Sequence, residues 1–69
     1  MEMTFKLEDN AYFATNSIKP VTITQFDDDY FELFMSKGDL NIEAPIKVGF
    51  ETFDEARKWA EAYVGFSAQ

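Results

Sequence analysis

The chain has no cysteine and no histidine among its 69 residues. This excludes disulfides, thiol chemistry and the side chain that most often acts as a general base or a metal ligand. Only three glycines are present, and they form no run that could cradle a phosphate. Because no nucleophile can be paired with a base, the sequence predicts a protein that is not an enzyme and has no cofactor.

Long apolar runs are also missing. No stretch approaches the roughly 20 apolar residues that a helix needs to span a bilayer. The chain begins with an acidic residue, Glu2, instead of the basic residues of a signal peptide. We therefore expect a soluble, cytoplasmic protein with no membrane partner.

Basic residues are scarce, with six lysines and arginines against thirteen acidic residues and a formal net charge of −7. This excess of negative charge argues against direct binding to nucleic acid or to an anionic membrane. It favours a protein partner with a basic surface. The alternative interpretation is that the charge only keeps a small protein soluble.

Aromatic residues are abundant by contrast, with eight phenylalanines, three tyrosines and one tryptophan. The chain is near the lower size at which a domain folds without metals or cross-links. The aromatic side chains can supply that packing, so we expect a single domain over residues 1–69.

Strands are indicated wherever apolar and polar residues alternate. The alternation is clearest from Leu40 to Phe50, where the even positions are apolar and predict one buried face. The sequence also allows a short strand at 11–15, after the turn-forming cluster Glu8-Asp9-Asn10. The strands that we expect lie at about 3–8, 20–26, 30–35 and 40–51.

One amphipathic helix is indicated at about 53–64, where apolar residues follow one another at spacings of three and four. Thr52 and Glu55 form a capping box at its start, and Gly65 is a natural stop. Trp59 falls on the apolar face of this helix, so we expect it in the core.

The stretch after the aspartate triplet at 27–29 has two interpretations. A helix from Asp28 to Lys37 would have acidic residues in its first turn and Gly38 at its end. We prefer a strand, because one register then matches inward residues across three strands. The pairs expected are Phe26–Tyr30, Ile23–Leu33 and Val21–Met35, followed by Met35–Leu40, Leu33–Ile42 and Phe31–Ala44. The fold predicted is α+β, with a three- to four-stranded antiparallel sheet and one C-terminal helix packed on one face.

The same register gathers acidic and aromatic residues on the sheet face that points away from the helix. Glu32 would lie directly opposite Glu43, and a like-charged pair of this kind costs stability. Exposed aromatic residues beside such charges are typical of a contact site. The candidate partner-binding residues are Asp27, Asp28, Asp29, Tyr30, Glu32, Phe34 and Glu43.

Two alternatives remain for this face. The N-terminal segment could cover Phe26, Tyr30 and Phe34 and form a second small core, or these aromatics could mediate self-association. The aspartate triplet lacks the ligand alternation, the glycine and the glutamate of a calcium loop. A solvated turn without a metal is therefore expected there.

The strand-to-helix segment contains Ala44-Pro45-Ile46, Glu51-Thr52, Asp54-Glu55-Ala56, Ala60-Glu61 and Tyr63-Val64. In these residues it resembles the corresponding segment of the small RNA polymerase inhibitor that T7-like phages carry. The family's following strand has no counterpart after Gly65, and the front half of this chain has an extra hairpin, so no functional residue is transferred. In length, acidity and layout the chain is similar to small phage-encoded inhibitors more broadly, including anti-CRISPR and anti-restriction proteins, some of which mimic nucleic acid.

The function expected from this resemblance and from the charge is inhibition. The protein would bind the basic surface of a host nucleic-acid-handling protein, such as a CRISPR effector, as a nucleic-acid mimic in the host cytoplasm. The alternatives are an antitoxin-like or regulatory domain that binds a basic protein, and a self-associating interaction module. We expect a monomer or a weak homodimer.

Overall fold

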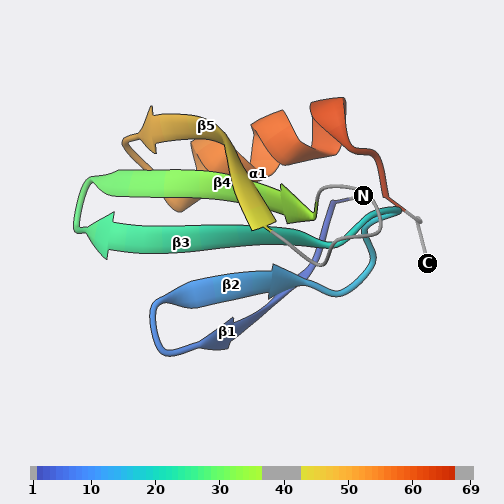
Figure 1. The fold of residues 1–69 in the computed structure, drawn as a ribbon, viewed down its shortest axis with the longest axis horizontal. Coiled ribbons are helices and arrows are strands. Elements are labelled where there is room, and N and C mark those ends of the chain that lie inside the picture. The colour runs from blue at the N-terminus through green and yellow to red at the C-terminus, as the bar shows by residue number, and fades with distance from the viewer. Residues whose placement is uncertain (1, 37–42, 67–69) are drawn as a thin grey trace.

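The computed structural model describes residues 2–36 and 43–66, and they form one antiparallel sheet covered on one side by a helix (Figure 1). The strands are hydrogen-bonded in the order of the chain, β1-β2-β3-β4-β5. The helix packs against the last three strands and lies behind β4 and β5 in the view of Figure 1. The elements are β1 (Phe5–Glu8), β2 (Ala11–Ala14), β3 (Val21–Asp27), β4 (Tyr30–Ser36), β5 (Glu43–Phe50) and α1 (Phe53–Tyr63).

The α+β class, the antiparallel sheet and the C-terminal helix are confirmed, but the expected number of three to four strands is wrong, since the sheet has five. The additional strand is β2, which a tight turn at Asp9 and Asn10 folds back onto β1. Asp9 adopts a positive φ of 55°, which aspartate tolerates better than most residues. Asn10 then fixes this hairpin to β3, because its carbonyl accepts from the Gln25 amide at 2.8 Å and its side-chain amide donates to the Gln25 carbonyl at 3.0 Å.

The central hairpin has the predicted strands. Residues 30–36 form β4, so the alternative helix is wrong over this part of the chain; Lys37 lies outside the described residues. The pairs Ile23–Leu33 and Val21–Met35 are confirmed. The pair Phe26–Tyr30 is wrong, because Tyr30 pairs with Asp27 and Phe26 is the extra residue of a β-bulge.

The predicted register between β4 and β5 is wrong. Phe31 pairs with Phe50 and Leu33 with Lys47, and Met35 pairs with Ala44 instead of Leu40. Leu40 and Ile42, which we expected to pair with β4, lie outside the described residues.

Two register shifts then interrupt β5. They leave Ile46 and Gly49 as extra residues, and Gly49 has a φ of 83° that favours glycine. Each bulge reverses the alternation, so Val48 lies opposite Glu32 on the open face, although its even position predicted burial.

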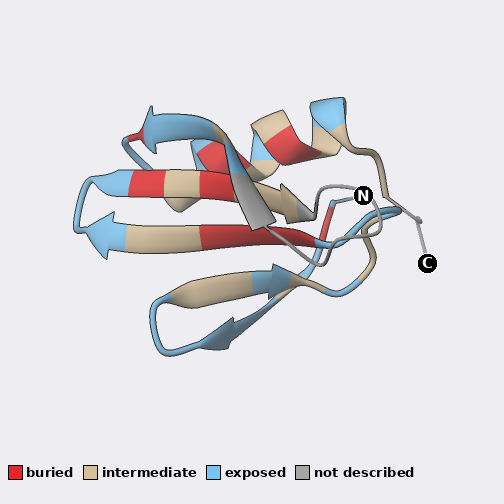
Figure 2. Ribbon diagram, in the orientation of Figure 1, coloured by how far each residue is buried: buried red, intermediate tan, exposed pale blue. Residues whose placement is uncertain are grey.

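The core lies between the centre of the sheet and α1 (Figure 2). Ala56 and Ala60 are the buried residues of the helix, and their small side chains let its backbone lie close to the strands. Phe53, at the start of the helix, contacts the rings of Phe5, Tyr12 and Phe31, with centroids 5.2, 4.2 and 6.5 Å away. The buried apolar residues are Met3, Val21, Ile23, Phe31, Leu33, Phe50, Ala56 and Ala60.

The helix has the ends that the sequence predicted. The Thr52 hydroxyl accepts from the Glu55 amide at 3.1 Å, which satisfies one free donor of the first turn. Gly65 follows the last turn with a φ of 86°, the left-handed conformation that commonly ends helices. Trp59 packs against the core, with its ring centroid 6.3 Å from that of Phe50.

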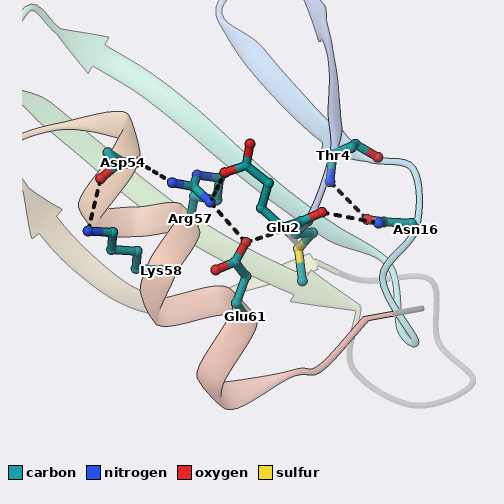
Figure 3. A network of polar contacts seen from close by, with 8 residues as sticks. Glu2, Thr4, Asn16, Asp54, Arg57, Lys58 and Glu61 are labelled. Carbon is teal, nitrogen blue, oxygen red and sulfur yellow. Dashed lines mark hydrogen bonds and ion pairs between the residues drawn. The ribbon is translucent and has the colours of Figure 1, made fainter. Parts of the chain in front are cut away.

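A polar network ties the N-terminal segment to α1 (Figure 3). The Arg57 guanidinium donates to the carboxylates of Glu2 at 2.7 Å and Glu61 at 3.0 Å, and it also contacts Asp54. The Met3 amide donates to the same Glu61 carboxylate at 2.6 Å. These contacts hold the start of the chain against the helix and place Met3 in the core.

Candidate protein-binding site

The order of the strands brings most of the acidic residues to one end of the molecule. In an antiparallel sheet that follows the order of the chain, the carboxyl ends of β1, β3 and β5 all lie at the same end. Figure 1 shows the turn between β1 and β2, the turn between β3 and β4 and the start of α1 at this end, on the left. We call this region the acidic end. Its members, more than half of the thirteen acidic residues, are Glu8, Asp9, Asp27, Asp28, Asp29, Glu51, Asp54 and Glu55.

Some of these charges are compensated within the molecule. Lys6 lies 3.4 Å from Glu8, and Arg57 and Lys58 both contact Asp54. The Arg57 guanidinium is the main cause that holds the pKa of Asp54 below its usual value.

The aspartate triplet differs from Glu8 and Asp54 in this respect. Among residues 2–36 and 43–66, no lysine or arginine forms an ion pair with Asp27, Asp28 or Asp29. The Asp27 carboxylate accepts from the Asp28 amide at 2.8 Å and so shapes the turn, while all three residues are exposed. The turn therefore presents uncompensated negative charge to solvent.

An exposed aromatic pair adjoins this turn. Phe26 and Tyr30 contact each other edge to face, with ring centroids 6.3 Å apart. A hydrogen bond to the Glu32 carboxylate is the main cause that raises the pKa of the Tyr30 phenol, with contributions from burial and from the negative charge. Tyr30, Glu32 and the triplet therefore form one continuous surface, and Phe26 belongs to it.

The structure separates the two other predicted site residues from this surface. Phe34 lies on the same sheet face, opposite Thr22 and Pro45, but four residues along β4 from Tyr30, or about 13 Å at the usual rise of a strand. Glu43 pairs through its backbone with Ser36, near the other end of the sheet; its side chain lies outside the described part. The predicted opposition of Glu32 and Glu43 is therefore wrong, since Val48 lies opposite Glu32 and Glu43 pairs with Ser36.

The N-terminal segment does not cover the aromatic pair. It forms β1 and β2 within the sheet, beside β3, and its residues Phe5 and Tyr12 pack on the helix side against Phe53. The expectation of a second core over Phe26 and Tyr30 is wrong, because the segment pairs edge to edge with the sheet instead of lying on its open face.

Sequence reasoning missed the members of the acidic end other than the aspartate triplet, of which Glu8, Asp9 and Glu51 are examples. The signal was present, since acidic residues follow each of the three strands β1, β3 and β5. It becomes readable only when the number of strands is known.

In the described part of the chain, no three acidic side chains converge as they would around a metal ion, and no helix there is long and apolar enough to cross a membrane. No protein-family model, curated protein or solved structure matches the chain.

Proposed function

We propose that this protein binds a basic surface of a partner protein through its acidic end. The observation that carries the proposal is the aspartate triplet at 27–29, which is exposed and continuous with an exposed aromatic pair. No lysine or arginine of the described residues forms an ion pair with it. Negative charge gathered at one end attracts a basic surface over about 8 Å at physiological ionic strength.

The two parts of this surface have different tasks. Charge complementarity sets mainly the rate of association and the choice of partner. Buried aromatic side chains contribute much of the affinity of protein interfaces. Asp28 and Asp29 should therefore govern how fast the complex forms, and Phe26 and Tyr30 how slowly it dissociates.

The finer proposal is that the partner handles nucleic acid and that binding inhibits it. Proteins that bind nucleic acid present basic surfaces to phosphates, so a protein with a concentrated acidic end can occupy such a surface in place of the nucleic acid. The resemblance of the chain to small phage-encoded inhibitors, including anti-CRISPR proteins, supports the same function.

The test is a capture experiment with two forms of the protein. The wild type and the triple variant D27N/D28N/D29N are immobilised and exposed to a lysate of the cells in which the protein occurs. Asparagine keeps the side-chain oxygen with which Asp27 accepts from the Asp28 amide, so the turn should be preserved. We expect the wild type to retain a basic protein that nucleic acid displaces, and the variant to associate with it at least about tenfold more slowly at low salt.

Each part of the proposal has its own contradicting result. An acidic partner, or equal association rates for the two forms at low salt, would overturn binding through the acidic end. A basic partner that nucleic acid does not displace would support binding through the acidic end but contradict mimicry of nucleic acid. Tyr30→Ala serves as the complementary variant, because it should speed dissociation and leave association nearly unchanged.

A further inference from the structure

The two edges of the sheet differ in how open they are to another strand. At one edge, β5 carries two bulges, and Pro45 and Lys47 lie between or beside them. Bulges, proline and lysine are devices that prevent edge strands from pairing. At the other edge, β1 pairs with β2 in one uninterrupted register, and no strand of the described residues lies beyond it (Figure 1).

The hydrogen bonds of β1 show which of its backbone groups are free. The Thr15 amide donates to the Thr4 carbonyl at 2.8 Å, so this is a hydrogen-bonded pair of the antiparallel ladder. Such pairs alternate along a ladder, and therefore Lys6 and Glu8 also bond to β2. The amide and carbonyl groups of Phe5 and Leu7 then point to the free edge.

The side chains of residues 6–8 are complementary to those of a second copy of the same segment that runs in the opposite direction. Lys6 and Glu8 lie on the open face of the sheet and form an ion pair at 3.4 Å. Between them, Leu7 points to the helix side and is 55% exposed. Reversing the direction of Lys6-Leu7-Glu8 places a lysine opposite each glutamate and leucine opposite leucine.

We propose that two copies of the protein associate through β1, antiparallel and centred on Leu7. Leu7 of each copy exchanges both backbone hydrogen bonds with Leu7 of the other, which is the geometry its outward amide and carbonyl require. Lys6 of each copy lies opposite Glu8 of the other, and opposite charges across strands are stabilising. The two sheets of five strands become one continuous sheet.

Two features of the chain oppose dimerisation, and the proposed arrangement compensates both. A lysine on an edge strand normally opposes pairing, but here Glu8 of the second copy compensates it. Two copies with a net charge of −7 repel each other, but the antiparallel arrangement points their aspartate triplets in opposite directions, and Glu8, which lies within the pairing, faces Lys6. Since only a few residues of each copy take part, the dimer is weak and depends on concentration.

Charge-reversal variants test the proposed register. Lys6→Glu makes every charge along the pairing negative, and Glu8→Lys makes every one positive. Sedimentation of each protein over a concentration range up to about 1 mM, at fixed ionic strength, should show both single variants to dimerise at least about tenfold more weakly than the wild type. An equimolar mixture of the two should restore dimers, because each negative side chain then faces a positive one.

The double variant K6E/E8K is the matched control, because it keeps the net charge and restores both opposite pairs. It should dimerise like the wild type. A wild type that stays monomeric over the whole range, or single variants that dimerise as well as the wild type, would overturn the proposal. Association that follows net charge alone, stronger in Glu8→Lys and weaker in Lys6→Glu without recovery in the mixture, would overturn it too.

A cross-linking experiment tests the same register independently. The chain has no cysteine, so Leu7→Cys introduces one thiol per copy. Paired residues in a hydrogen-bonded antiparallel pair have Cα atoms about 5.5 Å apart, which suits a disulfide. Under mild oxidation this variant should form a covalent dimer, while Val48→Cys, at a similarly exposed position of the other edge strand (50% against 55%), should not; equal cross-linking of the two would contradict pairing through β1.

Discussion

Arg57 joins the N-terminal segment to the helix, and replacing it with glutamine tests this assignment. Its guanidinium, only 15% exposed, contacts the carboxylates of Glu2, Asp54 and Glu61. The substitution removes the positive charge from the centre of the network and leaves three carboxylates without it. Glu61 is affected most, because its side chain is 18% exposed and it also accepts from the Met3 amide.

The size of the effect follows from how exposed each contact is. A hydrogen bond to a charged group that is partly buried contributes about 1.5–3 kcal/mol, whereas an exposed ion pair contributes at most about 1 kcal/mol. The contact with Glu61 should therefore dominate, and we expect Arg57→Gln to lower the free energy of unfolding by about 2 kcal/mol. A domain of this length is expected to have a total of about 3–10 kcal/mol, so the loss is a large fraction.

Acid should remove the part of this difference that comes from the contact with Asp54. Arg57 holds the pKa of Asp54 below its usual value, so this contact stabilises the fold above the pKa of an unfolded aspartate, about 4. The stabilisation is lost as the pH falls through the lowered pKa of the folded state. The difference between the wild type and the variant should therefore be smaller near pH 2 than at pH 7.

Urea unfolding at the two pH values measures both differences. Lys58→Gln is the matched control, since Lys58 is a neighbour in the same helix whose side chain is 70% exposed and contacts Asp54 at 3.4 Å. It should change the free energy of unfolding by no more than about 0.5 kcal/mol. Equal effects of the two substitutions at pH 7, or a difference for Arg57→Gln that does not decrease at low pH, would refute the reasoning.

Two further predictions concern β5 and the aromatic pair. Gly49→Ala should cost about 1–2 kcal/mol in urea unfolding, because Gly49 has a φ of 83° and an alanine is strained there; an added Cβ meets no atom within 4 Å, so an unchanged midpoint would show that the bulge relaxes. In an absorbance titration, Tyr30 should ionise above the ordinary tyrosine pKa of 10.0, and the stability from its contact with Glu32 should be lost as the pH rises through that raised value. Glu32→Gln should lower this pKa, and Tyr30→Phe should remove the corresponding signal, which identifies it.

The sequence by itself determined the parts of the fold that depend on neighbouring residues. The helix, its start at Thr52 and its stop at Gly65 could be read directly, since capping involves groups only a few positions apart. The pairing of Val21 and Ile23 with β4 could also be predicted, because a tight turn fixes the register of the two strands that it joins.

The tertiary structure decided the register of β5. The alternation from Leu40 to Phe50 predicted one regular strand, but Ile46 and Phe50 both pack in or against the core while Val48 between them is turned outward. Only two bulges achieve this, and whether a bulge forms depends on how side chains fit against the partner strand and the helix. The alternation within one strand contains no information about that fit.

The acidic end depended on the tertiary structure for a different reason. With four strands and no β2, the turn after β1 and the aspartate triplet would lie at opposite ends of the sheet. The short strand β2 adds one reversal of direction, and this brings Glu8 and Asp9 to the same end as Asp27, Asp28 and Asp29. The sequence shows which residues are charged. Which of them lie together depends on how many times the chain reverses its direction in the sheet.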